Sequence, residues 1–218
     1  MTRSVIPRSL MVVLALAATV LGPMSAAAQA LRPGTDYTVL RLEQPVESDD
    51  RIEVVELFWY GCIHCYNLEP HVEAWLKTLP PDVRFVRLPA VFNERWAHDA
   101  ALYYAFEALG LVERLHRPLF DAIHRERLRT DNIEALRQWL QRQGVEADRV
   151  LETMRSFGVQ ARVRRAAQLT SAYRIDGTPA MAVHGRYTVS AEQARSFPGM
   201  LETVDRLVVE VRRARAKK

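Results

Sequence analysis

Short runs of apolar residues with the two-residue period of strands occur near both ends of the chain. The alternating segment 37–42 predicts an edge strand, and the β-branched and aromatic segment 52–59 predicts a central strand. A third strand is predicted at 83–89, and two more at 178–183 and 186–189, joined by a turn at His184-Gly185. The strands therefore fall into two groups, and the long segment between them has no strand pattern.

Helical spacing of apolar residues begins directly after the predicted central strand. It predicts a helix at 62–79, kinked at Pro70 and ended by the two prolines at 80–81. Further helices are predicted at 94–109, at 111–127 (which Pro118 interrupts or splits), from a capping box at 131–134 to residue 143, at 146–157, at 159–173 after a break at Gly158, and at 199–215. The residues expected in the core of the helical block are Ala100, Leu102, Tyr103, Tyr104, Phe106 and Trp139.

Without the helical block, the predicted order is β-β-α-β followed by β-β-α. A strand, a helix and a second strand in succession form a βαβ unit, and open α/β sheets place their sites at the carboxyl ends of such strands. The fold class is therefore α/β, with one sheet interrupted by an inserted all-helical domain. We expect residues 31–92 and 158–218 to form the sheet domain and residues 93–157 to form the insertion.

The first 30 residues have the layout of a secretory signal peptide. Arg3 and Arg8 give a positive start, residues 10–21 an apolar core, and residues 25–30 a small-residue cleavage zone. An uncleaved membrane anchor is the alternative, but about a dozen apolar residues are short for a span, which needs roughly 20. We expect export, with cleavage after either Ala28 or Ala30.

Composition and charge narrow the classes of partner. Loss of Arg3 and Arg8 with the leader lowers the formal net charge from +4 to +2, which is no signature of nucleic-acid binding. The basic end at 212–218 fits a solvated helix terminus, where cations complement the helix dipole. Because no second apolar run of membrane-spanning length follows the leader, we expect a soluble mature protein.

The chain has two cysteines, Cys62 and Cys65, where the predicted central strand gives way to a helix. A cysteine at a helix N-terminus faces unpaired backbone N–H groups, which favour the nucleophilic thiolate. A structural disulfide is the ordinary alternative in an exported protein, but a bond across so short a loop constrains the unfolded chain very little. Zinc is a second alternative, yet this pair supplies only two of the usual four ligands. We interpret the pair as a thiol–disulfide redox centre.

Glu56 is an acidic residue inside the predicted central strand. Because burial of an isolated carboxylate is costly, Glu56 must be solvated, paired or protonated. It lies either on a wet face of the strand or beneath the cysteines, as a proton acceptor with a raised pKa. The residues alone favour neither interpretation.

Two separate segments carry a family resemblance. The segment 58–65 (Phe-Trp-Tyr-Gly-Cys-Ile-His-Cys), a proline at position 70 and the sequence Gly177-Thr178-Pro179 ahead of a strand together resemble the thioredoxin superfamily. The helical insertion and the Cys-x-His-Cys centre are similar to those of the DsbA family of exported thiol oxidases, over nearly the whole mature chain. The resemblance implies a thioredoxin-like fold in which Cys62 is the exposed nucleophile and Cys65 its buried resolving partner.

The resemblance also implies roles for residues around the cysteines. Thr178-Pro179 matches the family's cis-proline loop, which faces the disulfide and pairs its backbone with substrate; an ordinary loop proline is the alternative. Glu56 matches the family's buried acidic position, which favours a functional role for it.

The two residues between the cysteines are expected to tune the couple. The ring of His64 is expected to favour the Cys62 thiolate and so to make the disulfide a stronger oxidant, unless it merely faces solvent. Ile63 stands where the best-known family members have proline, which leaves the redox potential open. Ile63 and Trp59 are apolar beside the site and are expected to help bind unfolded chains. The other histidines have no partner in the sequence and are expected as surface or core residues: His71, His98, His116, His124 and His184.

Together these features predict a periplasmic thiol:disulfide oxidase that passes the Cys62–Cys65 disulfide to reduced, unfolded secreted proteins through a mixed disulfide at Cys62. By resemblance, a quinone-linked membrane protein of the DsbB type reoxidises it. We expect a monomer with no cofactor beyond the redox-active disulfide. The alternatives are a thiol reductase or disulfide isomerase, disfavoured because no residues remain for a dimerisation domain, and a redox-inert client-binding module.

Overall fold

Within residues 30–47 and 50–217, five strands form one mixed sheet in the order β1-β5-β4-β2-β3. The strands are β1 (Thr38–Val39), β2 (Ile52–Phe58), β3 (Val83–Pro89), β4 (Ala180–Val183) and β5 (Tyr187–Ser190). All seven residues of β2 are buried, as expected for a central strand covered on both faces. The hairpin β4–β5 lies between β1 and β2, with a strand on either side.

The computed structural model describes residues 2, 30–47 and 50–217. The expected leader lies outside the described residues apart from positions 2 and 30, so the cleavage positions after Ala28 and Ala30 stay a prediction. The rest of the chain, Leu31–Lys218, forms one compact unit. The boundaries expected between the sheet domain and the insertion also stay a prediction.

The register of the strands brings distant parts of the chain to one end of the sheet. β2 and β3 are parallel, with Glu56 opposite Arg87. β2 and β4 are antiparallel, with Leu57 opposite Ala180. The residues that follow β2 therefore meet the residues that precede β4.

Eight helices lie within the described part of the chain. They are α1 (Ile63–Leu76), α2 (Glu94–Ala108), α3 (Val112–His124), α4 (Ile133–Arg142), α5 (Ala147–Arg155), α6 (Phe157–Ala172), α7 (Ala191–Ala194) and α8 (Phe197–Arg215). Helices α2 to α6 occupy the chain between β3 and β4, which confirms the inserted helical block. Pro118 lies inside α3 and does not split it.

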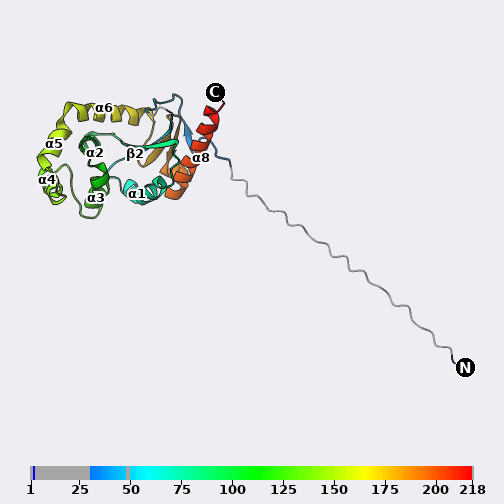
Figure 1. Ribbon diagram of the computed structural model, residues 1–218, viewed down its shortest axis with the longest axis horizontal. Coiled ribbons are helices and arrows are strands. Elements are labelled where there is room, and N and C mark those ends of the chain that lie inside the picture. The colour runs from blue at the N-terminus through cyan, green and yellow to red at the C-terminus, as the bar shows by residue number, and fades with distance from the viewer. Residues whose placement is uncertain (1, 3–29, 48–49, 218) are drawn as a thin grey trace. The chain divides into compact units, whose positions relative to one another are not determined.

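Two apolar clusters cover the two faces of the sheet. In Figure 1, α8 lies toward the right of the folded unit and α2 to α5 lie toward the left. Val54 and Met181 face one cluster, which includes buried residues of α1 and α8. Val55 and Ala182 face the other, which extends into the helical block. The residues expected in the core of that block, from Ala100 to Trp139, are all buried. The cluster around Val55 and Ala182 therefore joins the sheet and the helical block in one core.

Several element boundaries differ from the predicted ones. Helix α4 is capped by Asn132, whose side chain accepts from the N–H of Ala135, so the capping box predicted from Asp131 is wrong. Helices α5 and α6 separate at Ser156, whose hydroxyl caps α6, and the predicted break at Gly158 falls inside α6. The predicted edge strand at 37–42 is two residues long. Helix α7, which opens with a capping box at Ser190, has no counterpart in the predicted elements.

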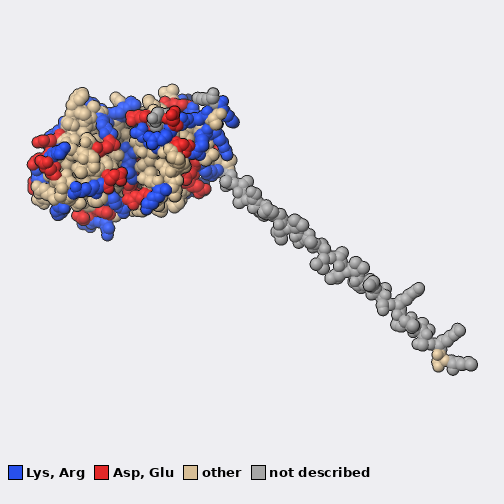
Figure 2. Space-filling view, in the orientation of Figure 1, with Lys and Arg blue, Asp and Glu red and all other residues tan. Residues whose placement is uncertain are grey.

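Basic and acidic side chains alternate over the face of the folded unit that Figure 2 shows. Many of them pair locally. For example, Arg212 of α8 donates to the carboxylate of Asp82. None of the helices in the described residues combines the length and the apolar character needed to cross a membrane.

Candidate active site

Cys62 caps the N-terminus of α1, immediately after the turn that follows β2. Its backbone is extended (φ −87°, ψ 115°), its N–H donates to the carbonyl of Trp59 at 3.0 Å, and its own carbonyl accepts the N–H of Tyr66 at 3.1 Å. Cys62 is partly exposed and Cys65 is fully buried one helical turn later. The structure thus places the two cysteines at the strand-to-helix junction, one facing solvent and one facing the core.

The pKa values of the two thiols are shifted in opposite directions. Hydrogen bonding from the Cys65 thiol, from Thr178 and from the backbone N–H groups of Cys65 and His64 lowers the pKa of Cys62 to about 5, against the opposing effect of burial. Burial raises the pKa of Cys65 well above its ordinary value. At neutral pH the reduced pair therefore holds a thiolate at Cys62 and a thiol at Cys65.

The loop before β4 closes over Cys62. The Thr178-Pro179 peptide bond is cis. In its protonated form the Cys62 thiol donates to the carbonyl oxygen of Thr178, with the Sγ 3.2 Å from that oxygen. Pro179 is buried. No local pattern predicts the contact between Cys62 and Thr178, which follows from the antiparallel pairing of β2 with β4.

The two residues between the cysteines point outward. Ile63 is 47% exposed, and His64 is also exposed. His64 contributes to the low pKa of Cys62 through its backbone N–H. The role expected for its ring stays a prediction.

Trp59 is fixed beside the cysteines by the helical block. Its indole N–H donates to Asp99 at 2.7 Å, and its ring stacks on Trp96 with centroids 4.3 Å apart. Phe92, which is 45% exposed, packs edge-on against Trp96. Gly61 allows this arrangement, because a Cβ there would lie 2.3 Å from the Trp59 ring. An apolar aromatic surface therefore adjoins the turn that carries Cys62.

Glu56 is buried, not on a wet face of its strand. It is 1% exposed, and its carboxylate lies 3.2 Å from the Nε of Arg87 on the neighbouring strand. Burial, together with the negative charge of Glu69, raises the pKa of Glu56 to about 8, despite the guanidinium beside it. Glu56 therefore holds a proton through most of the neutral range, which suits a group that exchanges protons.

The buried polar residues Glu69, His116 and Tyr60 were not predicted as parts of the site. Glu69 of α1 contacts the guanidinium of Arg87 and lies 3.1 Å from the Nε2 of His116. The Nδ1 of His116 lies 2.9 Å from the hydroxyl of Tyr60. One signal was available, since Glu69 falls four residues after Cys65, on the same buried helix face as Val72. His116 comes from α3, and only the fold brings it to α1.

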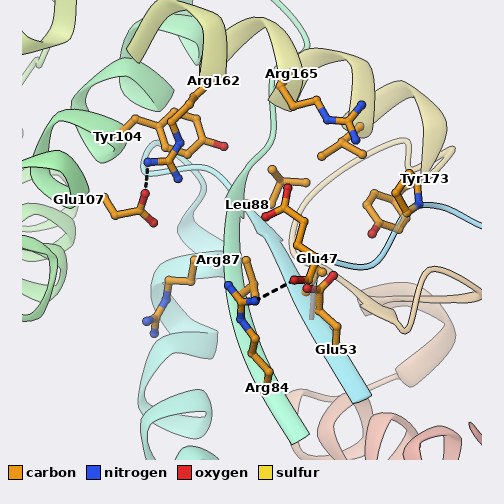
Figure 3. A pocket seen from close by; sticks show the side chains of 14 residues that line it. Glu47, Glu53, Arg84, Arg87, Leu88, Tyr104, Glu107, Arg162, Arg165 and Tyr173 are labelled. Atoms are coloured by element: carbon orange, nitrogen blue, oxygen red, sulfur yellow. Dashed lines mark hydrogen bonds and ion pairs between the residues drawn. The ribbon is translucent and has the colours of Figure 1, made fainter. Parts of the chain in front are cut away.

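A pocket of about 200 Å³ lies on the other face of β2 and β3, beneath α6 (Figure 3). Glu53, Arg84, Tyr104 and Tyr173 are among its lining residues. Two of the arginines that line it have partners: Arg162 contacts the carboxylate of Glu107, and Arg84 donates to the backbone carbonyl of Glu47 at 3.4 Å. None of the residues predicted for the redox site lines this pocket.

Comparison with known proteins identifies relatives over most of the chain. A family model described as "DSBA-like thioredoxin domain" matches residues 85–201. The thiol:disulfide interchange protein DsbA of Pseudomonas aeruginosa is 37% identical over 211 residues, which cover 97% of this chain and all of the relative. Its namesake from Bordetella pertussis is 40% identical over 201 residues, covering 91% of this chain and 96% of the relative.

Solved structures show the same likeness. The crystal structure of Pseudomonas aeruginosa DsbA aligns with a TM-score of 0.79 at 38% identity, covering 85% of this chain and 96% of that one. The oxidoreductase DsbA from Xylella fastidiosa aligns with a TM-score of 0.78 at 33% identity, covering 84% of this chain and 98% of that one. The sheet with its helical insertion is thus shared along nearly the whole length of these proteins.

Proposed function

The chain belongs to the DsbA family of thioredoxin-fold thiol:disulfide oxidoreductases, and from this we propose that it acts as a periplasmic oxidase, donating its Cys62–Cys65 disulfide to newly exported proteins. The observation that carries the proposal is that the pKa values of the two thiols are shifted in opposite directions. The pKa of Cys62 is lowered to about 5, and that of Cys65 is raised. Stabilising the Cys62 thiolate stabilises the reduced pair, and this makes the disulfide more oxidising. That direction is already established for DsbA proteins as a group.

The transfer proceeds in two exchange steps. A client thiolate attacks the Cys62 Sγ, the Cys62–Cys65 bond breaks, and Cys65 leaves as a thiolate that takes up a proton. A second client thiolate then attacks the client sulfur of the mixed disulfide and releases Cys62 as a thiolate. The client loses two electrons and gains a disulfide, and this chain ends as the reduced pair. The low pKa of Cys62 makes it a good leaving group in the second step.

The surrounding residues receive roles on the same basis. Glu56 supplies the proton that Cys65 takes up, supported by its burial and its pKa near 8. The backbone of Thr178-Pro179 pairs with the client next to the reacting sulfur, supported by its contact with Cys62. Because His64 lies at the exposed N-terminus of α1, its ring adds to the stabilisation of the Cys62 thiolate.

Apolar side chains around Cys62 receive unfolded clients. Ile63 and Trp59 flank the cysteine, and Phe92 extends the aromatic surface around Trp59. Such a surface suits chains whose apolar residues are still unburied.

Localisation and partners follow from the leader and the family. The protein is exported and cleaved after Ala28 or Ala30, acts as a monomer, and holds no cofactor beyond its disulfide. Once reduced, it is reoxidised by a quinone-linked membrane protein of the DsbB type.

The redox equilibrium of the Cys62–Cys65 pair with glutathione tests the proposal. We expect the pair to be reduced by glutathione at ratios that leave a thioredoxin-like disulfide intact. A thioredoxin-like equilibrium would contradict the oxidase and favour a reductase. A Cys62→Ser variant provides the comparison for a redox-inert module, since such a module would retain its full effect on clients without the cysteine.

A further inference from the structure

Two buried carboxylates share one guanidinium beside the redox site. Glu56 and Glu69 are each 1% exposed, and both contact Arg87, which is itself largely buried. Arg87 balances one negative charge, so ionisation of both carboxylates leaves an uncompensated charge in the core. Because such a charge is costly, the pair keeps one proton at neutral pH. Something in the fold must decide which carboxylate holds it.

His116 distinguishes the two carboxylates. Its Nε2 lies 3.1 Å from Glu69, whereas its Nδ1 faces the hydroxyl of Tyr60 at 2.9 Å. Burial raises the pKa of Tyr60 well above its ordinary value, so the hydroxyl keeps its proton. Within the described residues Nδ1 is the only acceptor near that buried hydroxyl, so we infer that the hydroxyl donates to Nδ1. Nδ1 is then the acceptor nitrogen, and the ring proton of neutral His116 lies on Nε2, toward Glu69.

We propose that His116 is a positioning residue that keeps Glu69 ionised and thereby assigns the exchangeable proton of the pair to Glu56. The Nε2 of His116 lies within ion-pair distance of the Glu69 carboxylate, although the contact lacks the geometry of a hydrogen bond, and a donor dipole so close to a carboxylate favours the charged form. Glu69 then satisfies Arg87, and its remaining negative charge favours the protonated form of Glu56. The aromatic rings of Phe58 and Phe120 hold the His116 ring edge-on at 5.3 and 5.1 Å, which limits its rotation.

The charged and titratable groups around His116 agree with this assignment. Burial acts to raise the pKa of Glu69, and the contact with His116 leads the influences that outweigh burial and lower it. Burial and the charge of Arg87 lower the pKa of His116 itself, so its ring stays neutral at pH 7. The groups that face this cluster are Glu69 from α1, Arg87 from β3, Glu56 from β2, Tyr60 from the turn after β2, Tyr103 from α2 and Glu113 from α3.

The inference rests on the proposed function only in its last step, the delivery of the Glu56 proton to Cys65. The site of the proton is a property of the folded protein alone. The effect of His116 on disulfide exchange follows if Glu56 serves Cys65.

Carbon NMR of the glutamate carboxyl groups in the intact mature protein measures the site directly, with Glu56→Gln and Glu69→Gln assigning the two signals. We expect Glu56 to be the protonated member at pH 7 and Glu69 the ionised one. Nitrogen NMR should show the His116 proton on Nε2. A protonated Glu69, or a ring proton on Nδ1, overturns the proposal without any variant of His116.

Two variants of His116 test the contributions of its two ring nitrogens separately. In His116→Gln the amide reaches the position of Nε2 and keeps a donor for Glu69, whereas in His116→Asn it reaches only the position of Nδ1. We expect the Gln variant to keep Glu56 protonated and Glu69 ionised at pH 7. In the Asn variant the proton affinity of Glu56 should fall by about tenfold and that of Glu69 should rise, because the polar contact with the charged Glu69 carboxylate is lost.

His98→Gln, at a histidine of the helical block that contacts the carbonyl of Thr130, is the matched control and should leave both carboxylates unchanged. Equal titration in the Gln and Asn variants of His116 overturns the proposal. Confirmed titration with unaltered disulfide-exchange rates at every pH would instead refute the role of Glu56 in the proposed function, and leave the assignment by His116 standing.

Discussion

The Sγ of Cys62 lies 3.2 Å from the carbonyl oxygen of Thr178, although 116 residues separate them. The contact exists because β4 runs antiparallel to β2 and begins where β2 ends. It places a backbone acceptor beside the nucleophile, at the position where a client chain would approach. The reactive end of the molecule is therefore assembled from both sequence segments that flank the helical block.

The Cys62 thiol should titrate near pH 5 in the reduced protein, as thiolate absorbance near 240 nm would show. Its folded pKa lies below the ordinary cysteine value of about 8.5. The resulting stabilisation is present in full above the unfolded pKa and is lost as the pH falls toward 5. Reduced wild type should therefore gain stability over reduced Cys62→Ser between pH 5 and pH 8.5. A constant difference across that range would contradict the low pKa.

Glu56→Gln should stabilise the protein most at alkaline pH. The folded pKa of Glu56 is raised to about 8, so wild-type stability falls as the pH rises from the unfolded value of about 4.3 through 8. The variant lacks this loss, and its advantage over wild type should grow by a few kcal/mol between pH 5 and pH 8.5. Denaturant unfolding of the oxidised proteins at both pH values measures it. A difference independent of pH would mean that Glu56 stays ionised.

Tyr60→Phe should destabilise the protein by about 1–3 kcal/mol, because it leaves the buried Nδ1 of His116 without its partner. The phenyl ring retains the aromatic contacts with Phe58 and Phe120. Tyr37→Phe is the matched control, since the Tyr37 ring makes an edge contact with Tyr187 away from the redox site. Equal stability of the two variants in thermal unfolding would argue against a buried Tyr60–His116 hydrogen bond.

Gly61→Ala should displace the Trp59 ring, because its Cβ would lie 2.3 Å from the indole. Overpacking of this kind costs about 1–3 kcal/mol, and the fluorescence of the stacked Trp59–Trp96 pair should change with it. Gly158→Ala is the control, since Gly158 lies in α6 with open space around its Cβ position. That change should be neutral or stabilising by up to about 1 kcal/mol. An unperturbed spectrum in Gly61→Ala would contradict the observed packing.

Local patterns sufficed for much of the fold. The strand at 83–89 and the helices on either side of Gly110 were predicted within a few residues, because period and chain-breaking residues are local signals. The break between α5 and α6 lies at Ser156 and not at Gly158. Both a capping serine and a glycine can mark a helix boundary, and only the geometry of the turn decides between them. The family assignment and the α/β fold with a helical insertion are confirmed.

The candidate site was predictable only where it is contiguous in the chain. The positions of Cys62, Cys65 and Glu56 follow from one strand and the helix after it. Resemblance alone pointed to Thr178-Pro179, and neither pattern nor resemblance connected Glu69 with His116. Their contact depends on how α3 packs against α1, a long-range relationship that leaves no local signal. The functional roles of all these residues stay predictions.

The separation of Cys62 from Thr178 has a consequence for the timing of biogenesis. A chain exported from its N-terminus delivers both cysteines to the periplasm long before β4 arrives. Until then Cys62 lacks the hydrogen bonding from Thr178 that helps to lower its pKa, and it behaves more like any other thiol of a nascent protein. Until β4 is in place, the enzyme is itself an unfolded protein with unprotected cysteines, like its clients.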